Sequence, residues 1–327
     1  MEKRVLIVGD LHISDRFTGR HKDYLQNCFD CLDMIEKSIV ENKVTHLICL
    51  GDWIGIGQAE KTLRKRSNLM RLLLVLKRWN DMLDGNVYSL KGNHDIGGNT
   101  TDFDLMVTLG YLKNVDKLDI DGCRIHMFNY GEETRQIEID DNKSNIGCFH
   151  SNLLIEGETT WYRGGVGVEL SSLDNLFGIS MAIAGHIHNP SPRTTKTSIR
   201  DMGVSLIYPG CPTRPRLEPN MWDTTLGVIL KIEGNIVLPD YIRYKLKPYE
   251  EIFNEVIQEA DMLGEDAETL PFDMDSIGDI LGQLQYYGIN DGKDYVSQIK
   301  KVAGLDKPAA DIALKYIEDA EAEFDEK

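Results

Sequence analysis

Three short apolar runs near the N-terminus alternate with two longer segments, and this alternation restricts the possible folds more than any other feature. The runs are rich in Val, Ile and Leu, as buried strands are, and they are residues 4–10 (RVLIVGD), 44–52 (VTHLICLGD) and 86–95 (NVYSLKGNHD). Between them, residues 21–41 and 59–83 repeat apolar residues at helical spacing. This order predicts a parallel sheet with crossover helices, because parallel neighbours cannot be joined by a tight turn.

From about residue 115 to residue 247 the chain is mostly strand-like. Hairpin patterns cover residues 117–128, which contain an Asp-Gly turn, and residues 194–210 and 226–246. Two further apolar runs, residues 145–150 and 180–186, lie between the first and second of these hairpins. The order predicts an α/β fold in which two sheets pack face to face with helices outside.

The last part of the chain differs in charge from the rest. The formal net charge is −17, but residues 250–327 contain 21 acidic residues, six lysines and no arginine. The preceding part is therefore close to neutral, and the charge of the whole chain does not exclude a nucleic-acid partner. We expect one domain at residues 1–247 and an acidic helical C-terminal extension at residues 248–327, which either caps the domain or binds a partner.

Cysteine usage and hydropathy indicate an intracellular protein. The six cysteines lack the spacing of a secreted disulfide framework, so we expect reduced thiols. No apolar run reaches the length of a membrane span, and the N-terminal residues lack the apolar core of a signal peptide. These features predict a cytoplasmic protein with no membrane partner.

Residues of the kinds that bind metals follow five of the apolar runs. In open α/β sheets, sites form beyond the carboxyl ends of the strands, so these side chains are expected to meet. Carboxylate, amide and imidazole ligands suit Mn²⁺, Fe²⁺ or Zn²⁺, and a shared carboxylate is suited to a two-metal hydrolase. The candidates are Asp10, His12, Asp52, Asn93, His94, Asp95, His150, His186 and His188.

Each of these motifs alone has an ordinary structural explanation. A Gly-Asp pair is common, residues 92–94 fit a turn, and a lone His150 is typical of a hydrogen-bonded core histidine. His186 and His188 alternate, so on a strand both imidazoles point to one side. The joint occurrence of all five motifs in this order favours a metal site.

The motifs in order are Asp-x-His, Gly-Asp, Gly-Asn-His-Asp, a lone His and Gly-His-x-His, and together they resemble the calcineurin-like metallophosphoesterase superfamily over about residues 4–190. The resemblance implies a four-layer αββα sandwich with two divalent ions, for which we expect Mn²⁺, with Fe²⁺ or Zn²⁺ as alternatives. It implies these ligands: Asp10, His12 and His188 for one ion, Asn93, His150 and His186 for the other, and Asp52 between them. It also implies that His94 contacts the phosphate and protonates the leaving oxygen, with Asp95 orienting His94.

A later segment, residues 206–216 (LIYPGCPTRPR), resembles the Tyr-x-Gly-Ser-Pro segment of the SbcD-type nucleases of double-strand-break repair and phage recombination. This resemblance implies a DNA exonuclease or endonuclease that works with an SbcC-like ATPase in a bacterial or phage-infected cell. Those nucleases commonly carry an aromatic-acidic run after the second motif, where this chain has GDWIGIGQ. The alternative is another phosphoesterase on the same scaffold, either a phosphoprotein phosphatase or a phosphodiesterase for nucleotides or small molecules.

Basic residues near the motifs are candidates for binding DNA phosphates. One group lies in the predicted helix after Asp52, and another follows His188. A solvated helix face explains the first group equally well, and the apolar residues of that helix fit either core burial or a homodimer contact. The substrate-binding candidates are Arg64, Lys65, Arg66, Arg193 and Arg214.

Overall fold

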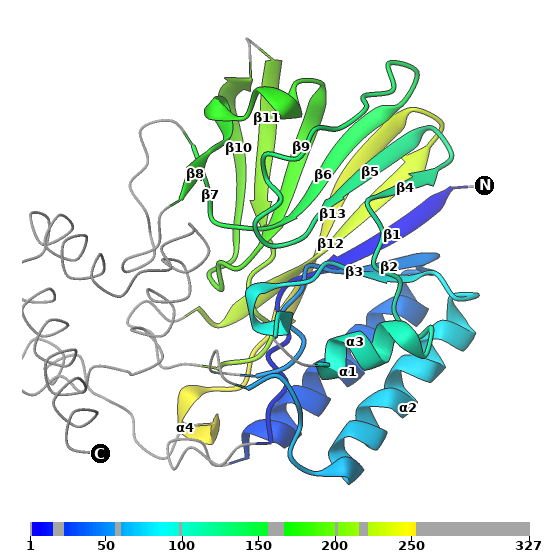
Figure 1. Ribbon diagram of the computed structural model, residues 1–327, viewed down its shortest axis with the longest axis vertical. Helices are drawn as coiled ribbons and strands as arrows, with labels where there is room; N and C mark the ends of the chain where they lie inside the picture. The colour runs from blue at the N-terminus through cyan, green and yellow to red at the C-terminus, as the bar shows by residue number, and fades with distance from the viewer. Residues whose placement is uncertain are drawn as a thin grey trace, which may run out of the picture. The chain divides into compact units, whose positions relative to one another are not determined.

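The computed structural model describes residues 2–15, 23–55, 60–97, 100–155, 167–199, 202–215 and 222–252. Two β-sheets lie face to face, and helices cover the outer side of one of them (Figure 1). Of the predicted extension, residues 248–252 are described and include one helical turn, α4 (Tyr249–Ile252). The rest of the extension lies outside the described residues, so a domain boundary after residue 247 stays a prediction.

The first sheet has five strands in the order β13-β12-β1-β2-β3. Its parallel strands and the helices between them are β1 (Lys3–Val8), α1 (Tyr24–Glu41), β2 (His46–Cys49), α2 (Arg66–Met82) and β3 (Val87–Ser89). This confirms the parallel sheet with crossover helices. The predicted C-terminal hairpin is also present, as β12 (Thr224–Glu233) and β13 (Ile236–Lys245), with β12 antiparallel to β1.

The second sheet has six strands in the order β10-β11-β9-β6-β5-β4. Its members are β4 (Lys117–Ile120), β5 (Cys123–Phe128), β6 (Ser144–His150), β9 (Ile179–Gly185), β10 (Ser191–Ile199) and β11 (Met202–Tyr208). β4 and β5 form one predicted hairpin, and β10 and β11 form another. The four inner strands are parallel to one another, and the two edge strands, β4 and β10, are antiparallel to the strands beside them. A separate pair of short strands, β7 (Leu153–Leu154) and β8 (Val168–Glu169), lies outside both sheets.

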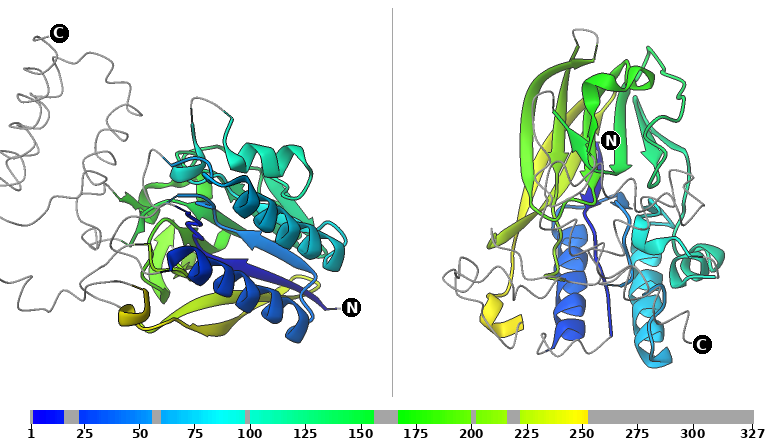
Figure 2. Two further views of the ribbon diagram at one scale, coloured as in Figure 1. Left: turned by 90° about the horizontal axis from the view of Figure 1, so that it is seen from below. Right: turned by 60° about the vertical axis from the view of Figure 1, so that its left-hand side comes forward.

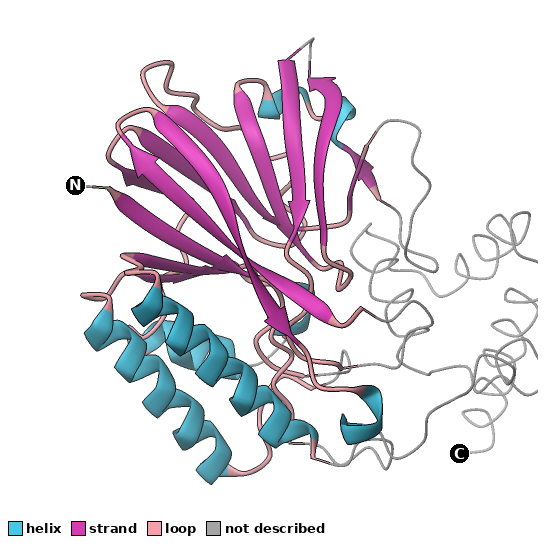
Figure 3. Ribbon diagram, turned by 180° about the vertical axis from the view of Figure 1, so that it is seen from behind, coloured by secondary structure: helices cyan, strands magenta, loops and turns pink. Residues whose placement is uncertain are grey.

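The alternation of side chains along β1 explains how the layers are held together. Val5 and Ile7 belong to the apolar core shared by the two sheets, whereas Leu6 and Val8 belong to the core between the first sheet and its helices. Successive side chains of a strand point to opposite faces, so an uninterrupted apolar run predicts burial on both sides. Figure 3 shows the α-helices together on the side of the first sheet away from the second, and Figure 2 shows α1 and α2 running along that sheet.

The outer face of the second sheet has a thin covering in the described residues. Two short 3-10 turns, η2 (Leu170–Ser172) and η3 (Asp174–Leu176), contribute Leu170 and Leu176 to an apolar cluster with Phe149 and Ala182 of the sheet. These turns take the place of long helices in this layer. The predicted α/β sandwich of two sheets is confirmed, and in the described residues its fourth layer consists of these short turns.

The predicted helix over residues 59–83 was too long at its start, because α2 begins at Arg66. The two carboxylate oxygens of Asp15 accept the main-chain N–H groups of Arg64 and Lys65, each at 2.8 Å. The main-chain N–H of Leu63 donates to Asp102 Oδ2 at 2.7 Å. These contacts are made across the fold and hold residues 63–65 outside the helix, so local periodicity could not predict them.

Asp102 belongs to a short helix that the sequence analysis did not predict, α3 (Asp102–Thr108). Its first turn has a capping box between Thr101 and Asp104, a local signal that could have been used. All six cysteines are buried and free, which confirms the prediction of unpaired thiols. Among the described helices, none is long and apolar enough to cross a membrane.

A substitution at Trp79 tests how strongly the packing of α2 against the rest of the domain contributes to stability. Its side chain is fully buried, and its indole N–H donates to Glu36 Oε2 of α1 at 3.0 Å. We expect Trp79→Ala to lower the free energy of unfolding by about 3–5 kcal/mol, because it leaves a cavity and removes this hydrogen bond. Val40→Ala on the neighbouring helix α1 removes a side chain that is 62% exposed, and should change the free energy by less than about 0.5 kcal/mol. Urea unfolding of both variants checks this, and equal effects would contradict it.

Candidate metal centre

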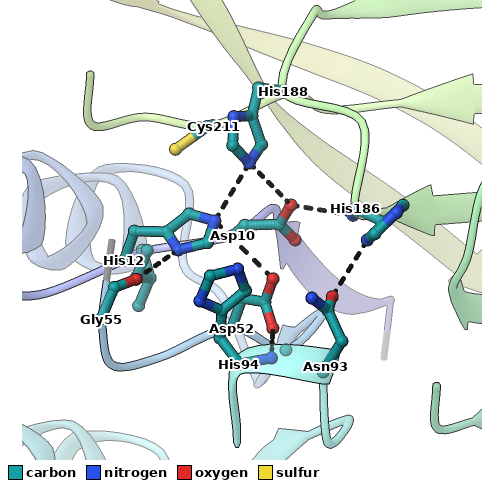
Figure 4. A network of polar contacts seen from close by, with 12 residues as sticks. Asp10, His12, Asp52, Gly55, Asn93, His94, His186, His188 and Cys211 are labelled. Carbon is teal, nitrogen blue, oxygen red and sulfur yellow. Dashed lines mark hydrogen bonds and ion pairs between the residues drawn. The ribbon is translucent and has the colours of Figure 1, made fainter. Parts of the chain in front are cut away.

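The ends of five strands bring the seven predicted metal ligands together, and Figure 4 shows six of them around one point. The ligands come from both sheets. Asp10 and His12 follow β1, Asp52 follows β2, and Asn93 follows β3 in the turn η1 (Asn93–Asp95). From the second sheet, His150 ends β6, and His186 and His188 follow β9. The site therefore lies beyond the carboxyl ends of parallel strands, as expected for this kind of sheet.

One cluster of ligand atoms consists of Asp10, His12 and His188. One ligand atom from each residue lies within 4.8 Å of the other two, and all three side chains are buried. The Nε2 atoms of His12 and His188 are 3.0 Å apart, and Asp10 Oδ2 is 3.9 Å from His188 Nε2. These are the three residues expected to share the first ion.

A second cluster contains Asn93, His150 and His186. The amide oxygen of Asn93 is 3.0 Å from His150 Nε2 and 3.0 Å from His186 Nδ1. A carboxylate oxygen of Asp52 lies within 4.8 Å of both imidazoles. The donor set is two nitrogens and two oxygens, which suits a borderline divalent ion.

The carboxylate of Asp52 lies between the two clusters. Its Oδ2 is 3.7 Å from His12 Nε2 in the first cluster and 3.3 Å from His150 Nε2 in the second. Its Oδ1 accepts the main-chain N–H of His94 at 2.8 Å, which fixes the plane of the carboxylate. This is the position that a bridging ligand requires.

Two of the histidines have a ring orientation set by main-chain carbonyl groups. His12 Nδ1 is 2.7 Å from the oxygen of Gly55, and His150 Nδ1 is 2.7 Å from the oxygen of Leu50. A carbonyl oxygen can only accept, so Nδ1 carries a proton in both rings and Nε2 is the atom that faces the cluster. Histidines that bind metals are usually held in this way, so the residues present fit the pair of divalent ions that the sequence implied.

The backbone is strained at three of the predicted ligands. His12, Asp52 and His186 have φ angles of 46°, 50° and 76°, in the left-handed region that non-glycine residues rarely adopt. Hydrogen bonds across the site hold these conformations: the Asp52 carbonyl accepts His12 N–H at 2.8 Å, and Asp10 Oδ2 accepts His186 N–H at 2.8 Å. Strain of this kind persists only where the surroundings impose it, and it clusters at functional sites.

Gly92, before Asn93, has no room for a side chain. A Cβ atom there would lie 2.1 Å from Asp52 Oδ1. The glycine therefore allows the third strand end to approach the bridging carboxylate. This gives the Gly-Asn-His-Asp motif a steric reason for its first residue.

Burial of so many ionisable groups shifts their pKa values. Burial raises the pKa of Asp10 to about 6, and the neighbouring Asp52 adds to the effect. Burial lowers the pKa of His186 to about 3, and it also lowers that of His12. A bound divalent cation favours ionised carboxylates and neutral imidazoles, so it would oppose the protonation of Asp10.

His94 and Asp95 occupy different places relative to this centre. The His94 ring lies edge-on to that of His12, with centroids 4.8 Å apart, and one of its nitrogens is close enough to His12 and Asp52 to share an ion with them. Asp95 was expected to orient His94. Instead its Oδ2 accepts the main-chain N–H of Asp52 at 2.7 Å and its Oδ1 that of Trp53 at 3.0 Å. The tight η1 turn directs this carboxylate to the main chain around Asp52, and the structure thus makes Asp95 a support for the bridging residue.

The predicted substrate-binding residues are dispersed. Arg64, Lys65 and Arg66 are exposed at the start of α2. Arg214 is buried, and its Nε donates to the carbonyl of Lys247 at 2.9 Å. Arg193 lies in β10, and its side chain is outside the described residues.

Two residues beside the second cluster were not predicted as part of the site. The Nζ of Lys61 donates to the Asn93 carbonyl at 3.1 Å. The ring of Tyr130 lies 6.1 Å from that of His150 and 5.9 Å from that of His186, measured between centroids. Lys61 belongs to the basic stretch already noted in the sequence, whereas the position of Tyr130 after β5 carries no motif.

Asp52→Asn tests the bridging position. The amide keeps the shape of the side chain and an oxygen for His94 N–H, but it removes the negative charge between the clusters. We expect the number of Mn²⁺ ions bound per chain to fall from two to one or fewer, measured by titration calorimetry with elemental analysis. Asp119→Asn, on the surface strand β4, is the matched control and should bind as the wild type does. Two ions bound with wild-type affinity in Asp52→Asn would rule out bridging.

A match to a protein-family model agrees with this site. A sequence model of the calcineurin-like phosphoesterase family matches residues 3–190. No curated protein matches the chain. Among solved structures, the chain is similar to Vps29 of Chaetomium thermophilum, at 14% identity, with 75% of this chain and 98% of that chain covered and a TM-score of 0.36.

Two other solved structures show a similar level of likeness. One is YfcE, a phosphoesterase from E. coli, with 10% identity, 75% and 100% coverage and a TM-score of 0.34. The other is wild-type Vps29 of Entamoeba histolytica in complex with Zn²⁺, with 12% identity, 73% and 98% coverage and a TM-score of 0.35. The family match includes every predicted metal ligand. The chain belongs to the calcineurin-like phosphoesterase family.

Proposed function

We propose that this protein is a two-metal nuclease that hydrolyses phosphodiester bonds of DNA, with Mn²⁺ as the ion. The observation that carries the phosphoesterase part is the place of Asp52 Oδ2, 3.7 Å from His12 Nε2 and 3.3 Å from His150 Nε2. A carboxylate between two sets of imidazole nitrogens is the arrangement expected for two ions that share a bridging ligand. Such a pair, when bound, neutralises charge on the phosphate and activates water for attack on phosphorus.

The side chains around the ions have separate tasks in this proposal. Asp10, His12 and His188 hold one ion, and Asn93, His150 and His186 hold the other. His94 lies beside the first cluster and does not serve as a ligand here. Its imidazole contacts the phosphate and gives a proton to the leaving oxygen, a role for which histidine is well suited near neutral pH. Asp95 keeps the loop of Asp52 in place.

DNA is the proposed substrate because of the surroundings of the site and the resemblance of residues 206–216 to SbcD-type nucleases. The Lys61 side chain is held at Asn93, and Arg64, Lys65 and Arg66 are exposed nearby in sequence. Such cations bind phosphates independently of base sequence. Tyr130, beside His150 and His186, offers an aromatic face on which a base can stack.

The nuclease assay compares DNA with small esters. We expect purified protein with Mn²⁺ to cleave single- or double-stranded DNA from an end or internally, and His94→Gln to lower the rate by about 10²–10⁴-fold while still binding metal. His46→Gln is the matched control, because His46 lies at the start of β2, at the opposite end of the strand from Asp52. It should keep full activity. Gel analysis of labelled DNA and calorimetric metal titration provide the two measurements.

Two outcomes would reject different parts of this proposal. Intact DNA together with rapid hydrolysis of bis-p-nitrophenyl phosphate or of a phosphopeptide would reject the nuclease and favour another phosphoesterase. Full activity in His94→Gln would reject the proton-donor role. Activity without any divalent ion would reject the two-metal mechanism as a whole.

Partners and location are part of the same proposal. We propose that the nuclease acts with an SbcC-like ATPase, and that residues 248–327, which lie mostly outside the described residues, form the partner-binding segment. Co-purification of the ATPase with the full chain, and its loss on removal of residues 253–327, is the expected result. A cytoplasmic location agrees with six buried free thiols, and cell fractionation tests it.

A homodimer contact through α2 is a separate proposal. The helix exposes Met70 and Leu74, at 57% and 53%, next to each other on one side. We propose that these two side chains form part of an apolar contact surface. Sedimentation of the purified chain as a monomer at micromolar concentration would reject the dimer.

A further inference from the structure

Hydrogen bonds and close contacts hold the segment from Tyr208 to Thr213 along most of its length. The segment resembles part of a nuclease motif, but the resemblance gives it no role in catalysis or binding. The carbonyl of Pro209 accepts the main-chain N–H of Leu226 at 2.9 Å and the hydroxyl of Thr225 at 2.7 Å. Gly210 has a φ of 82°, and a Cβ atom there would lie 2.7 Å from the His188 carbonyl oxygen. The main chain of the segment therefore packs directly against that of the Gly-His-x-His motif.

The segment contacts the predicted ligand His188 through its main chain. The main-chain N–H of Cys211 donates to the His188 carbonyl at 3.0 Å. His188 lies after the end of β9, where the ladder of the sheet no longer holds the chain. The hydrogen bond from Cys211 thus sets the main-chain position of a predicted ligand, and Figure 4 shows Cys211 beside it.

Two buried hydroxyl groups connect the same segment to the loop that carries His12. Thr213 Oγ1 donates to the carbonyl of Leu11 at 2.9 Å. Tyr24, from the first turn of α1, donates to the carbonyl of His12 at 2.9 Å, and its oxygen lies 3.1 Å from Thr213 Oγ1. Tyr24 and Thr213 are 3% and 1% exposed. The consecutive carbonyl groups of Leu11 and His12 therefore accept hydrogen bonds from side chains of two distant segments.

His12 is a residue at which such support matters. Its φ of 46° is left-handed, an unfavourable conformation for a histidine. Its N–H is held by the Asp52 carbonyl at 2.8 Å and its ring by Gly55 at 2.7 Å. The His12 carbonyl accepts the hydroxyl of Tyr24 at 2.9 Å, and the Cys28 thiol makes a longer contact to it at 4.0 Å. Together these contacts direct His12 Nε2 to within 3.0 Å of His188 Nε2.

We propose that Tyr24 and Thr213 are positioning residues for the ion held by Asp10, His12 and His188, and that they have little effect on the ion held by Asn93, His150 and His186. The inference rests on the proposed function only in taking the centre to bind two divalent ions. Partners that orient the ligands of a metal typically change its affinity by about 10–100-fold. The hydroxyl groups of Tyr24 and Thr213 act on main-chain carbonyls of the ligand loop, so their loss is expected to loosen one ion selectively.

Tyr24→Phe is the central variant, because it removes one oxygen atom and leaves the buried ring. Calorimetric titration of the full chain with Mn²⁺ should show one of the two sites weakened by about 10–100-fold, and the other within twofold of the wild type. Thr213→Val should act in the same direction, and Thr213→Ser, which keeps the hydroxyl, should restore wild-type affinity. Tyr244→Phe is the matched control: Tyr244 is 5% exposed and packs in the same apolar core as Tyr24. Both affinities should stay unchanged in Tyr244→Phe.

Two further backgrounds identify which ion is affected. In His186→Ala, which retains the first cluster, Tyr24→Phe should still weaken the remaining ion. In His188→Ala, which retains the second cluster, it should have no effect. The reverse pattern, equal weakening of both sites, or unchanged affinities in Tyr24→Phe would overturn the inference while leaving the two-metal proposal intact. A wild-type chain that binds no Mn²⁺ would instead overturn the proposed function, and this inference with it.

Discussion

The carbonyl oxygen of Asp52 joins the first two strand ends, and the rest of the site depends on this contact. It accepts the main-chain N–H groups of Leu11 at 3.0 Å and His12 at 2.8 Å. Beyond it, Ile13 N–H donates to Trp53 and Gly55 N–H donates to Ile13, at 2.8 Å and 2.9 Å. The parallel pairing of β1 and β2 thus continues past the strands into the two loops. This pairing places the ring of His12 beside the carboxylate of Asp52.

The energetic consequence is a strained backbone inside a dense hydrogen-bond network. His12 and Asp52 both take left-handed conformations, each of which costs about 1–3 kcal/mol. The network opposes that cost with buried hydrogen bonds, including those from Asp52 and Trp53 N–H to the Asp95 carboxylate. A buried polar group without a partner would cost about as much as the strain itself. The loops are therefore held in one conformation by contacts within the chain itself.

Much of the fold followed from periodicity, because buried strands and amphipathic helices leave a direct pattern in the sequence. The parallel strands, the hairpins and α1 all appeared in this way. The start of α2 did not, because Asp15 and Asp102 hold residues 63–65 from distant parts of the chain. The place of Asp95 was also missed, since its neighbour His94 suggested a local partner whereas its real partners are main-chain groups around Asp52. Tyr130 reaches the site because β5 pairs with β6 in the second sheet, which places Tyr130 beside His150.

The sequence by itself determined which kinds of ligand this protein has and that each follows the end of a strand. Those are local properties, because they depend on residue type and on the alternation of side chains along each strand. The family resemblance also implied which ligands share an ion, but only the tertiary structure decided how close their atoms lie. His12 and His188 are 176 residues apart in sequence, yet their Nε2 atoms are 3.0 Å apart. That proximity comes from the packing of two sheets and from the buried contacts of Tyr24, Cys211 and Thr213 beneath them, and no local pattern encodes it.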